Sequence, residues 1–389
     1  MTFRSKIKNL SHKIFLVGGG FLAYGISAMQ TTILSIHIAH YCSQKYLAVF
    51  SFLLSCLYFS VQLLRRNILE PFYQSDLVSI NINYKIQIAG VMSFMFIVSS
   101  ITAYISELFK LSLYLMLLTF STLFWEIRKA VLRKAKLIMR YSILEALILT
   151  VLSFIILGNL IGYSIDPEST ILLLLIMHIL SIFMTKRSTI TILEISKMPK
   201  SASSVRSYSF SEYLFVVSII VSNLWLMFAG YVDEIGEIRA VFLLLTLSTF
   251  SIGALRNSLA TEMSSSVINS LLLGAVLFNI VIVYFLPASF IQRIIPSVSD
   301  DFRSLLVPIS LDLIGSLTFM IFSLKLVRNK NMIISSESRC ISVIFLVLFF
   351  TFIDRENLDS LSIAYAYGLS SISGAIYLYL RKSKDTFFK

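Results

Sequence analysis

Apolar runs of about 20 residues recur along the whole 389-residue chain, and this repetition restricts the fold more than any other feature. A helix needs about 20 consecutive apolar residues to cross the hydrocarbon core of a membrane. Hydrophobic residues make up 57% of the sequence and charged residues only 14%, which leaves almost no room for a soluble domain. The sequence therefore predicts an all-α, polytopic membrane protein.

Charged residues and clusters of Pro, Gly or Ser divide the chain into about twelve predicted transmembrane helices. The first half gives six of them: Ile14–Ile38, Tyr46–Leu64, Ile86–Ile105, Leu111–Ile127, Ile143–Tyr163 and Ile171–Thr185. The second half gives the other six: Phe210–Ala229, Ile238–Leu255, Val267–Leu286, Leu305–Leu324, Cys340–Ile353 and Leu361–Leu380. Because Cys340–Ile353 is short for a span, the sequence leaves open whether it is a half-helix.

Basic residues are confined almost entirely to alternate connections. The N-terminus, the connections after every even-numbered predicted helix and the C-terminal tail hold all but six of the 33 Lys and Arg residues. The odd-numbered connections are acidic instead, for example at Glu107 and at Asp300-Asp301. Since basic loops stay in the cytoplasm, we predict a multi-pass protein of the cell (inner) membrane with both termini cytoplasmic. The net charge of +12 then lies beside anionic lipid head groups, and nucleic acid is not a predicted partner.

Two short matches half a chain apart indicate an internal duplication. Leu64-Arg65-Arg66-Asn67 closes the second predicted helix, and Leu255-Arg256-Asn257 closes the eighth. The long basic connection from Lys186 to Ser209 leaves six predicted helices on each side. An even number per half predicts two parallel-repeat lobes, residues 1–196 and 197–389. The alternative is that any inward-going helix ends in basic residues because of its orientation.

The motifs do not favour an enzyme. The sequence has no Walker-type phosphate-binding motif, and its three cysteines lack metal-ligand spacing. We therefore predict no catalytic residue, no metal and no cofactor. Of the scattered histidines, His178 is expected to hydrogen-bond a neighbouring helix, whereas His37 and His40 are expected to face water at the outer end of the first helix.

Charged residues inside the predicted spans are candidate functional sites, because a buried ion is costly unless it is paired or hydrated. Asp312 lies roughly 10 Å from the outer end of its predicted helix, at about 1.5 Å per residue. It either lines a hydrated cavity or pairs with a buried cation. Glu145, just inside the cytoplasmic end of the fifth predicted helix, either serves the same cavity or pairs with Arg128 or Arg140. Glu126 is expected to form a similar structural pair.

Arg65, Arg66 and Arg256 are the predicted substrate-binding residues, together with Asn67 and Asn257, which follow them. A guanidinium is always charged and binds phosphate in a bidentate manner, so these residues suit an anionic substrate near the cytoplasmic face. Ordinary anchoring at the membrane interface is the alternative.

The chain resembles the multidrug/oligosaccharidyl-lipid/polysaccharide exporter superfamily, particularly its polysaccharide (O-antigen-type) flippase branch. Leu64-Arg65-Arg66, followed by Glu70, looks like the end of the second helix in peptidoglycan-precursor flippases. Arg128 to Glu145 looks like the connection between spans 4 and 5 of polysaccharide exporters, and Arg239 to Arg256 looks like their span 8. Thr261-Glu262 stands where those exporters often have a proline.

The resemblance implies a central cavity between the two lobes and export by alternating access. The implied substrate is a polyprenyl-diphosphate-linked oligosaccharide, an O-antigen or capsular-type repeat unit for lipopolysaccharide and related polysaccharide biosynthesis. Arg65, Arg66 and Arg256 would attract its diphosphate, and Asp312 would take part in ion coupling. The other implied partners are membrane lipids and further polysaccharide-assembly membrane proteins. Two alternatives stay open: a membrane polysaccharide polymerase or acyltransferase, and a small-molecule exporter of the same superfamily.

Overall fold

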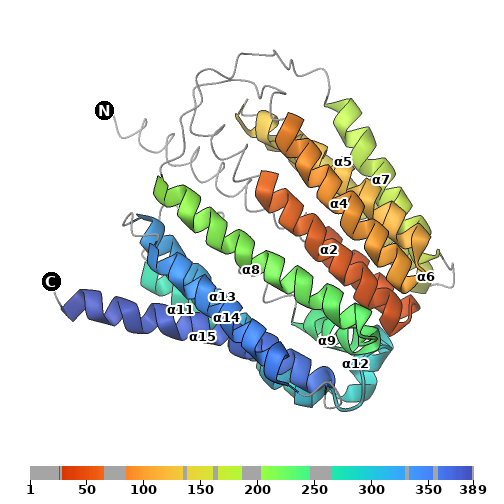
Figure 1. The fold of residues 1–389 in the computed structure, drawn as a ribbon. Coiled ribbons are helices and arrows are strands. Elements are labelled where there is room, and N and C mark those ends of the chain that lie inside the picture. Colours follow the sequence, from red (N-terminus) through yellow and green to blue (C-terminus); the bar gives the residue numbers. More distant parts are fainter. Residues whose placement is uncertain are drawn as a thin grey trace, which may run out of the picture.

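A computed structural model describes residues 26, 29–64, 85–134, 138–160, 165–185, 203–245, 265–328, 333–353 and 358–387. Within these ranges the chain is α-helical, and Figure 1 shows long helices that run alongside one another. Residues 29–41 form the first described helix. The others are α2 (Gln44–Leu64), α4 (Lys85–Ser106), α5 (Phe109–Lys134), α6 (Ile138–Leu160), α7 (Pro167–Met184), α8 (Ser203–Phe228), α9 (Val232–Leu244), α11 (Ser265–Phe285), α12 (Ala288–Ile294), α13 (Phe302–Arg328), α14 (Ile333–Phe352) and α15 (Ser360–Phe387).

Seven helices in the described ranges are long and apolar enough to cross a membrane. An eighth candidate is α11 together with α12, which meet at a bend of 106°. Helix α14 begins at Ile333 and is 20 residues long, so the short predicted span Cys340–Ile353 belongs to a helix of full membrane length. The protein is therefore multi-pass, as predicted, while the total of twelve spans in two lobes stays a prediction.

Local sequence signals explain where several helices begin and end. Asp166 caps α7, because its side chain accepts a hydrogen bond of 3.0 Å from the backbone N–H of Ser169, and Pro167 occupies the first helical position. Helix α8 ends at Phe228, and Gly230 just after it has a φ of 96°, a left-handed conformation that glycine adopts without a steric penalty. The Tyr231 N–H then bonds back to the carbonyl of Leu226, as in a Schellman motif.

Most helices pack mainly against helices of the same half, but α2 and α9, one from each half, pack against each other more than against any other helix. In the first half, α2, α4, α5, α6 and α7 contact one another, and in the second half α8, α9, α11, α13, α14 and α15 do. Between the halves, α2 contacts α8 and α9, and α4 contacts α8. Figure 1 shows α2 and α8 side by side in the middle of the molecule. One core of buried apolar side chains continues across this junction and includes Phe50, Ile235 and Phe302.

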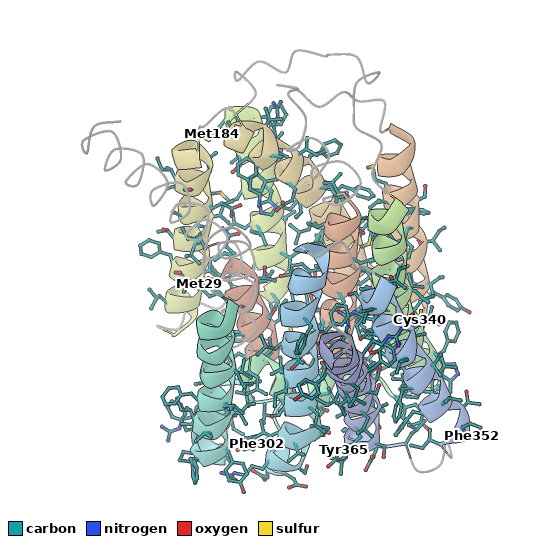
Figure 2. All side chains as sticks on the ribbon, turned by 90° about the vertical axis from the view of Figure 1, so that its left-hand side faces the viewer. Met29, Met184, Phe302, Cys340, Phe352 and Tyr365 are labelled. Carbon is teal, nitrogen blue, oxygen red and sulfur yellow. The ribbon has the colours of Figure 1, made fainter. Side chains whose placement is uncertain are left out.

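Large apolar side chains also cover the outside of the bundle, as expected of a protein surrounded by lipid. Phe352 is 81% exposed, and Phe96, Phe154 and Phe278 are also exposed. Figure 2 places Phe302 and Phe352 towards one end of the molecule and Met184 at the other. The charge pattern assigns the two phenylalanines to the outer side and Met184 to the cytoplasmic side, so the structure separates them in the same way.

Candidate functional site

The predicted site residues differ in what the structure says of them. Arg65, Arg66, Asn67, Arg256 and Asn257 lie outside the described residues. Asp312 and Glu145 are described, and they lie in different halves of the chain, on α13 and α6. The structure therefore gives two intramembrane polar sites to compare.

The second half encloses a cavity of about 110 Å³ among α8, α9, α13 and α15. Its polar lining consists of Asn223, Arg239, Asp312, Tyr367, Ser370 and Ser371. Its walls are otherwise apolar and are made by Phe215, Ile219, Ile235, Ile238, Phe242, Ile309, Ile363 and Ala364. Asp312 thus lines a cavity, which is one of the two roles that its depth in the membrane predicts.

Close packing of α13 against α15 brings Asp312 to its hydrogen-bond partner. A Cβ atom at position 315 would lie 2.6 Å from the backbone carbon of Ser371, so only glycine fits there. Gly368 makes a similar approach to the carbonyl oxygen of Pro308. With the two backbones this close, the Ser371 hydroxyl donates a hydrogen bond to Oδ1 of Asp312. A carboxylate inside the bundle is therefore held by a neutral hydroxyl.

Arg239 is the important cavity residue that was not predicted. The sequence places it at the very start of a predicted span, where a basic residue reads as an interfacial charge. In the structure α9 begins at Val232, so Arg239 lies about two turns inside the helix, at about 3.6 residues per turn. One feature of the sequence could have pointed to it: Arg239 is one of the few basic residues next to an acidic outer connection.

Arg239 makes no hydrogen bond or ion pair with any residue that the structure describes, although its charge interacts electrostatically with that of Asp312. The Tyr367 hydroxyl in the same cavity is buried and likewise has no hydrogen-bond partner in the described ranges. Buried polar groups are normally hydrogen-bonded in folded proteins. These two donors can therefore bind water or an oxygen-rich, anionic group.

A second buried cation, Arg339, stands behind the cavity wall. Its Cζ atom lies 4.1 Å from the ring centre of Phe215 and 3.4 Å from that of Phe319. These are cation–π contacts, which help to hold a guanidinium inside the bundle. Phe215 also lines the cavity, so Arg339 fixes part of the wall and adds positive charge near Asp312.

The first half holds a more tightly bonded polar cluster around Glu145, which is only 1% exposed. Its carboxylate accepts hydrogen bonds of 2.9 Å from Trp125 Nε1 and 2.7 Å from Gln30 Nε2. It also lies 3.0 Å from Lys129 Nζ, which in turn lies 2.5 Å from Glu126. Every oxygen of Glu145 thus has a partner.

Among the side chains that the structure describes, the cation that pairs with Glu145 is Lys129 and not Arg128, whereas the side chain of Arg140 lies outside the described residues. Trp125 and Lys129 are four residues apart and share one face of α5, which is the face that meets Glu145. Arg128 is one residue away and points elsewhere, and its Nη1 atom is buried without a partner among the described groups. The expected pairing of Glu126 with a nearby cation is confirmed, and the cation is again Lys129.

Two histidines contact neighbouring helices. His178 Nδ1 lies 3.3 Å from the Thr122 hydroxyl of α5, as predicted. The prediction that His37 faces water is wrong, because His37 is buried and its Nε2 atom lies 3.2 Å from the Thr170 hydroxyl of α7. Within the described ranges there is no group of three or more side chains suited to a metal ion.

No family model matches the chain, and no curated protein matches it. An inward-facing conformation of a multidrug resistance MATE family transporter of the MOP superfamily is 13% identical at a TM-score of 0.46, over 96% of this chain and 89% of that chain. A crystal structure of MATE in complex with MaL6 is 13% identical at a TM-score of 0.44, over 96% and 88%. Likeness at this level does not identify a function.

Proposed function

We propose that this protein is an alternating-access exporter that moves a polyprenyl-diphosphate-linked oligosaccharide across the cell membrane. The observation that supports this most directly is the cavity of the second half. It contains a guanidinium without a protein partner in the described ranges, Arg239, and a carboxylate, Asp312, inside a membrane-spanning bundle. Charges in such a place are costly and mark the path of a substrate or an ion.

The chemistry of the cavity suits a charged head group that carries sugars. The Arg239 guanidinium can bind a phosphate oxygen pair, and the Tyr367 and Ser370 hydroxyls and the Asn223 amide can bind sugar hydroxyls. In this proposal Arg65, Arg66, Asn67, Arg256 and Asn257 receive the diphosphate at the cytoplasmic mouth. The lipid tail stays in the bilayer throughout.

Asp312 is the better candidate for ion coupling, and Glu145 is the weaker one. Glu145 is held by Lys129 and by two further donors, so its charge is compensated in place. Asp312 is held by the neutral Ser371 hydroxyl, so gain or loss of a proton changes the net charge of the cavity. We propose that this change favours movement of residues 1–196 against residues 197–389.

The apolar walls of the cavity also favour a second candidate function, export of a small cationic compound. Apart from its polar lining, the cavity is walled by Phe, Ile and Ala side chains, and Asp312 supplies a negative charge. Such a wall suits the apolar part of a small cation. The lone guanidinium of Arg239 counts against a cationic substrate, which is why the anionic substrate ranks first.

Deletion of the gene in its host tests the proposed function. The expected result is accumulation of lipid-linked sugar repeats on the cytoplasmic leaflet, reversed by the wild-type gene and not by Arg239→Met. Normal export with shortened polysaccharide chains would instead indicate a polymerase. Normal polysaccharide with increased drug sensitivity would indicate the small-molecule exporter.

A further inference from the structure

Three hydrogen bonds join the two halves of the chain at one end of the molecule. His40 donates from Nδ1 to the carbonyl oxygen of Ile294 over 2.9 Å. Gln44 donates from Nε2 to the carbonyl oxygen of Ser297 over 3.0 Å, and the Ser297 hydroxyl donates to the carbonyl of Ala39 over 3.3 Å. The first-half partners flank the turn before α2, and the second-half partners lie at and just after the end of α12.

Gln44, the first residue of α2, also makes a close backbone approach to α9. A Cβ atom at Gly236 of α9 would lie 2.3 Å from the backbone carbonyl oxygen of Gln44, a distance that no real Cβ contact shows. Gln44 therefore touches α9 with its backbone while its side chain bonds to Ser297. One residue joins both second-half segments to the first half.

Apolar side chains fill the space beneath these polar contacts. Leu47, Ile235, Ile291 and Ile295 are all fully or almost fully buried and belong to the same core. Figure 1 shows α9, α12 and one end of α2 together at this end of the molecule. Packing as well as hydrogen bonds therefore holds the two halves together at this contact, which we call the seam. The charge pattern assigns this end to the outer side of the membrane.

Helix α9 extends from the seam to the cavity and contributes a residue to each. Gly236 and Arg239 are three residues apart on this 13-residue helix. Gly236 packs on Gln44, while Arg239 lines the cavity. A helix this short moves as one piece. When α9 moves away from α2, Arg239 must therefore change its position in the cavity.

We propose that His40, Gln44, Gly236 and Ser297 form an outer gate that closes the export path, and that its opening displaces Arg239 and so weakens the hold on the bound anionic group. The direction of release rests on the proposed function. The gate itself is a property of the protein without substrate, so the two proposals can fail separately.

Labelling of Cys42 measures gate opening directly. Cys42 lies in the turn before α2 and is partly buried, and in a Cys56→Ser, Cys340→Ser background it is the only thiol. Gln44→Leu removes one hydrogen bond, and Gly236→Ala forces α9 from α2. Each variant should raise the rate at which a membrane-impermeant maleimide labels Cys42 several-fold. Gly274→Ala on α11 is the matched control, because a Cβ atom there has no heavy atom within 4 Å.

Equal labelling rates in Gln44→Leu, Gly236→Ala and the control would overturn the gate. If Gly236→Ala does not fold, Gln44→Leu still decides the matter, because it adds no bulk to the helix contact. Bridging Gln44→Cys to Ser297→Cys with a short, cleavable bifunctional reagent gives the functional readout. Export should stop when the bridge forms and return when it is cleaved. Unchanged export with a complete bridge would refute the gate. If the variants label faster but lipid-linked sugars do not accumulate in the deletion strain, the proposed function alone is refuted.

Discussion

Lys129 Nζ lies 3.0 Å from Oε1 of the buried Glu145, and the same ammonium group lies 2.5 Å from Glu126. Two carboxylates of the first half thus share one cation. The second half is arranged in the opposite way, because Asp312 is held by a serine hydroxyl and Arg239 has no hydrogen-bonded or ion-paired partner in the described ranges. The pairing around Lys129 favours stability of the fold. The arrangement in the second half leaves Asp312 able to exchange a proton and Arg239 able to bind an anionic group.

Lys129→Met should destabilise the protein strongly, because it leaves Glu145 buried without its cation. Loss of one partner from a buried ion pair typically costs about 3–5 kcal/mol. Thermal unfolding of the purified protein in detergent measures the change. The triple variant Lys129→Met, Glu126→Gln, Glu145→Gln should recover part of the loss, since Glu145 is then no longer a buried charge without its cation. A wild-type melting temperature for Lys129→Met would show that the pair does not stabilise the fold.

Arg239→Met should abolish export and leave stability unchanged or raised. The guanidinium makes no hydrogen bond or ion pair with a described residue, so methionine removes only its electrostatic interaction with Asp312 and relieves part of the cost of desolvating the charge. Complementation of the deletion strain measures export, and detergent melting measures stability. Arg239→Lys keeps the charge and is the matched control, with partial export expected because lysine cannot bind phosphate in a bidentate manner. A large stability loss in Arg239→Met would assign the residue a structural role.

Asp312→Asn should lose export while keeping the fold. An asparagine oxygen can still accept the Ser371 hydrogen bond, so the close packing of α13 and α15 survives while the charge is lost. Ser371→Ala is the comparison, because it removes the hydrogen bond and keeps the charge, and we expect a milder loss of export. The same complementation assay ranks the two. Full export by Asp312→Asn would exclude this carboxylate from coupling.

Asp166→Ala should destabilise the protein by about 1 kcal/mol at neutral pH, the usual effect of removing a helix N-cap. Hydrogen bonds from Ser169 lower the pKa of Asp166 below its ordinary value. The stabilisation by the charged carboxylate is therefore fully present above the unfolded-state pKa of about 3.9 and is lost as the pH falls through the lower, folded-state value. Asp166→Asn keeps a capping oxygen that does not titrate. Melting curves of the three proteins from pH 7 to acid should show this loss in the wild type alone.

Much of the fold could be predicted from the sequence because span length and hydropathy are local properties. Where the chain is described, each predicted span overlaps a helix, and Asp312 is among the residues that line a cavity, while its role in ion coupling stays a prediction. The errors concern charges whose partners are distant in sequence. Arg339 reads as the end of a basic connection, yet it lies inside α14, where Phe215 and Phe319 accommodate it.

The same limit applies to the candidate site. The choice of Lys129 over Arg128 depends on which face of α5 meets α6, and the burial of His37 depends on how α7 packs against residues 29–41. Neither is visible in the order of residues. Arg239 was not predicted for a similar reason, since its depth depends on where α9 begins.

Transport by the purified protein tests the central claim most directly. The protein is reconstituted into liposomes that hold a fluorescent polyprenyl-diphosphate oligosaccharide, and a membrane-impermeant glycosidase reports how much sugar reaches the opposite leaflet. We predict that the wild type translocates the sugar and that Arg239→Met, equally folded, does so no faster than empty liposomes. Identical leaflet distributions with wild-type protein and with empty liposomes, under an imposed proton or sodium gradient, would contradict the account.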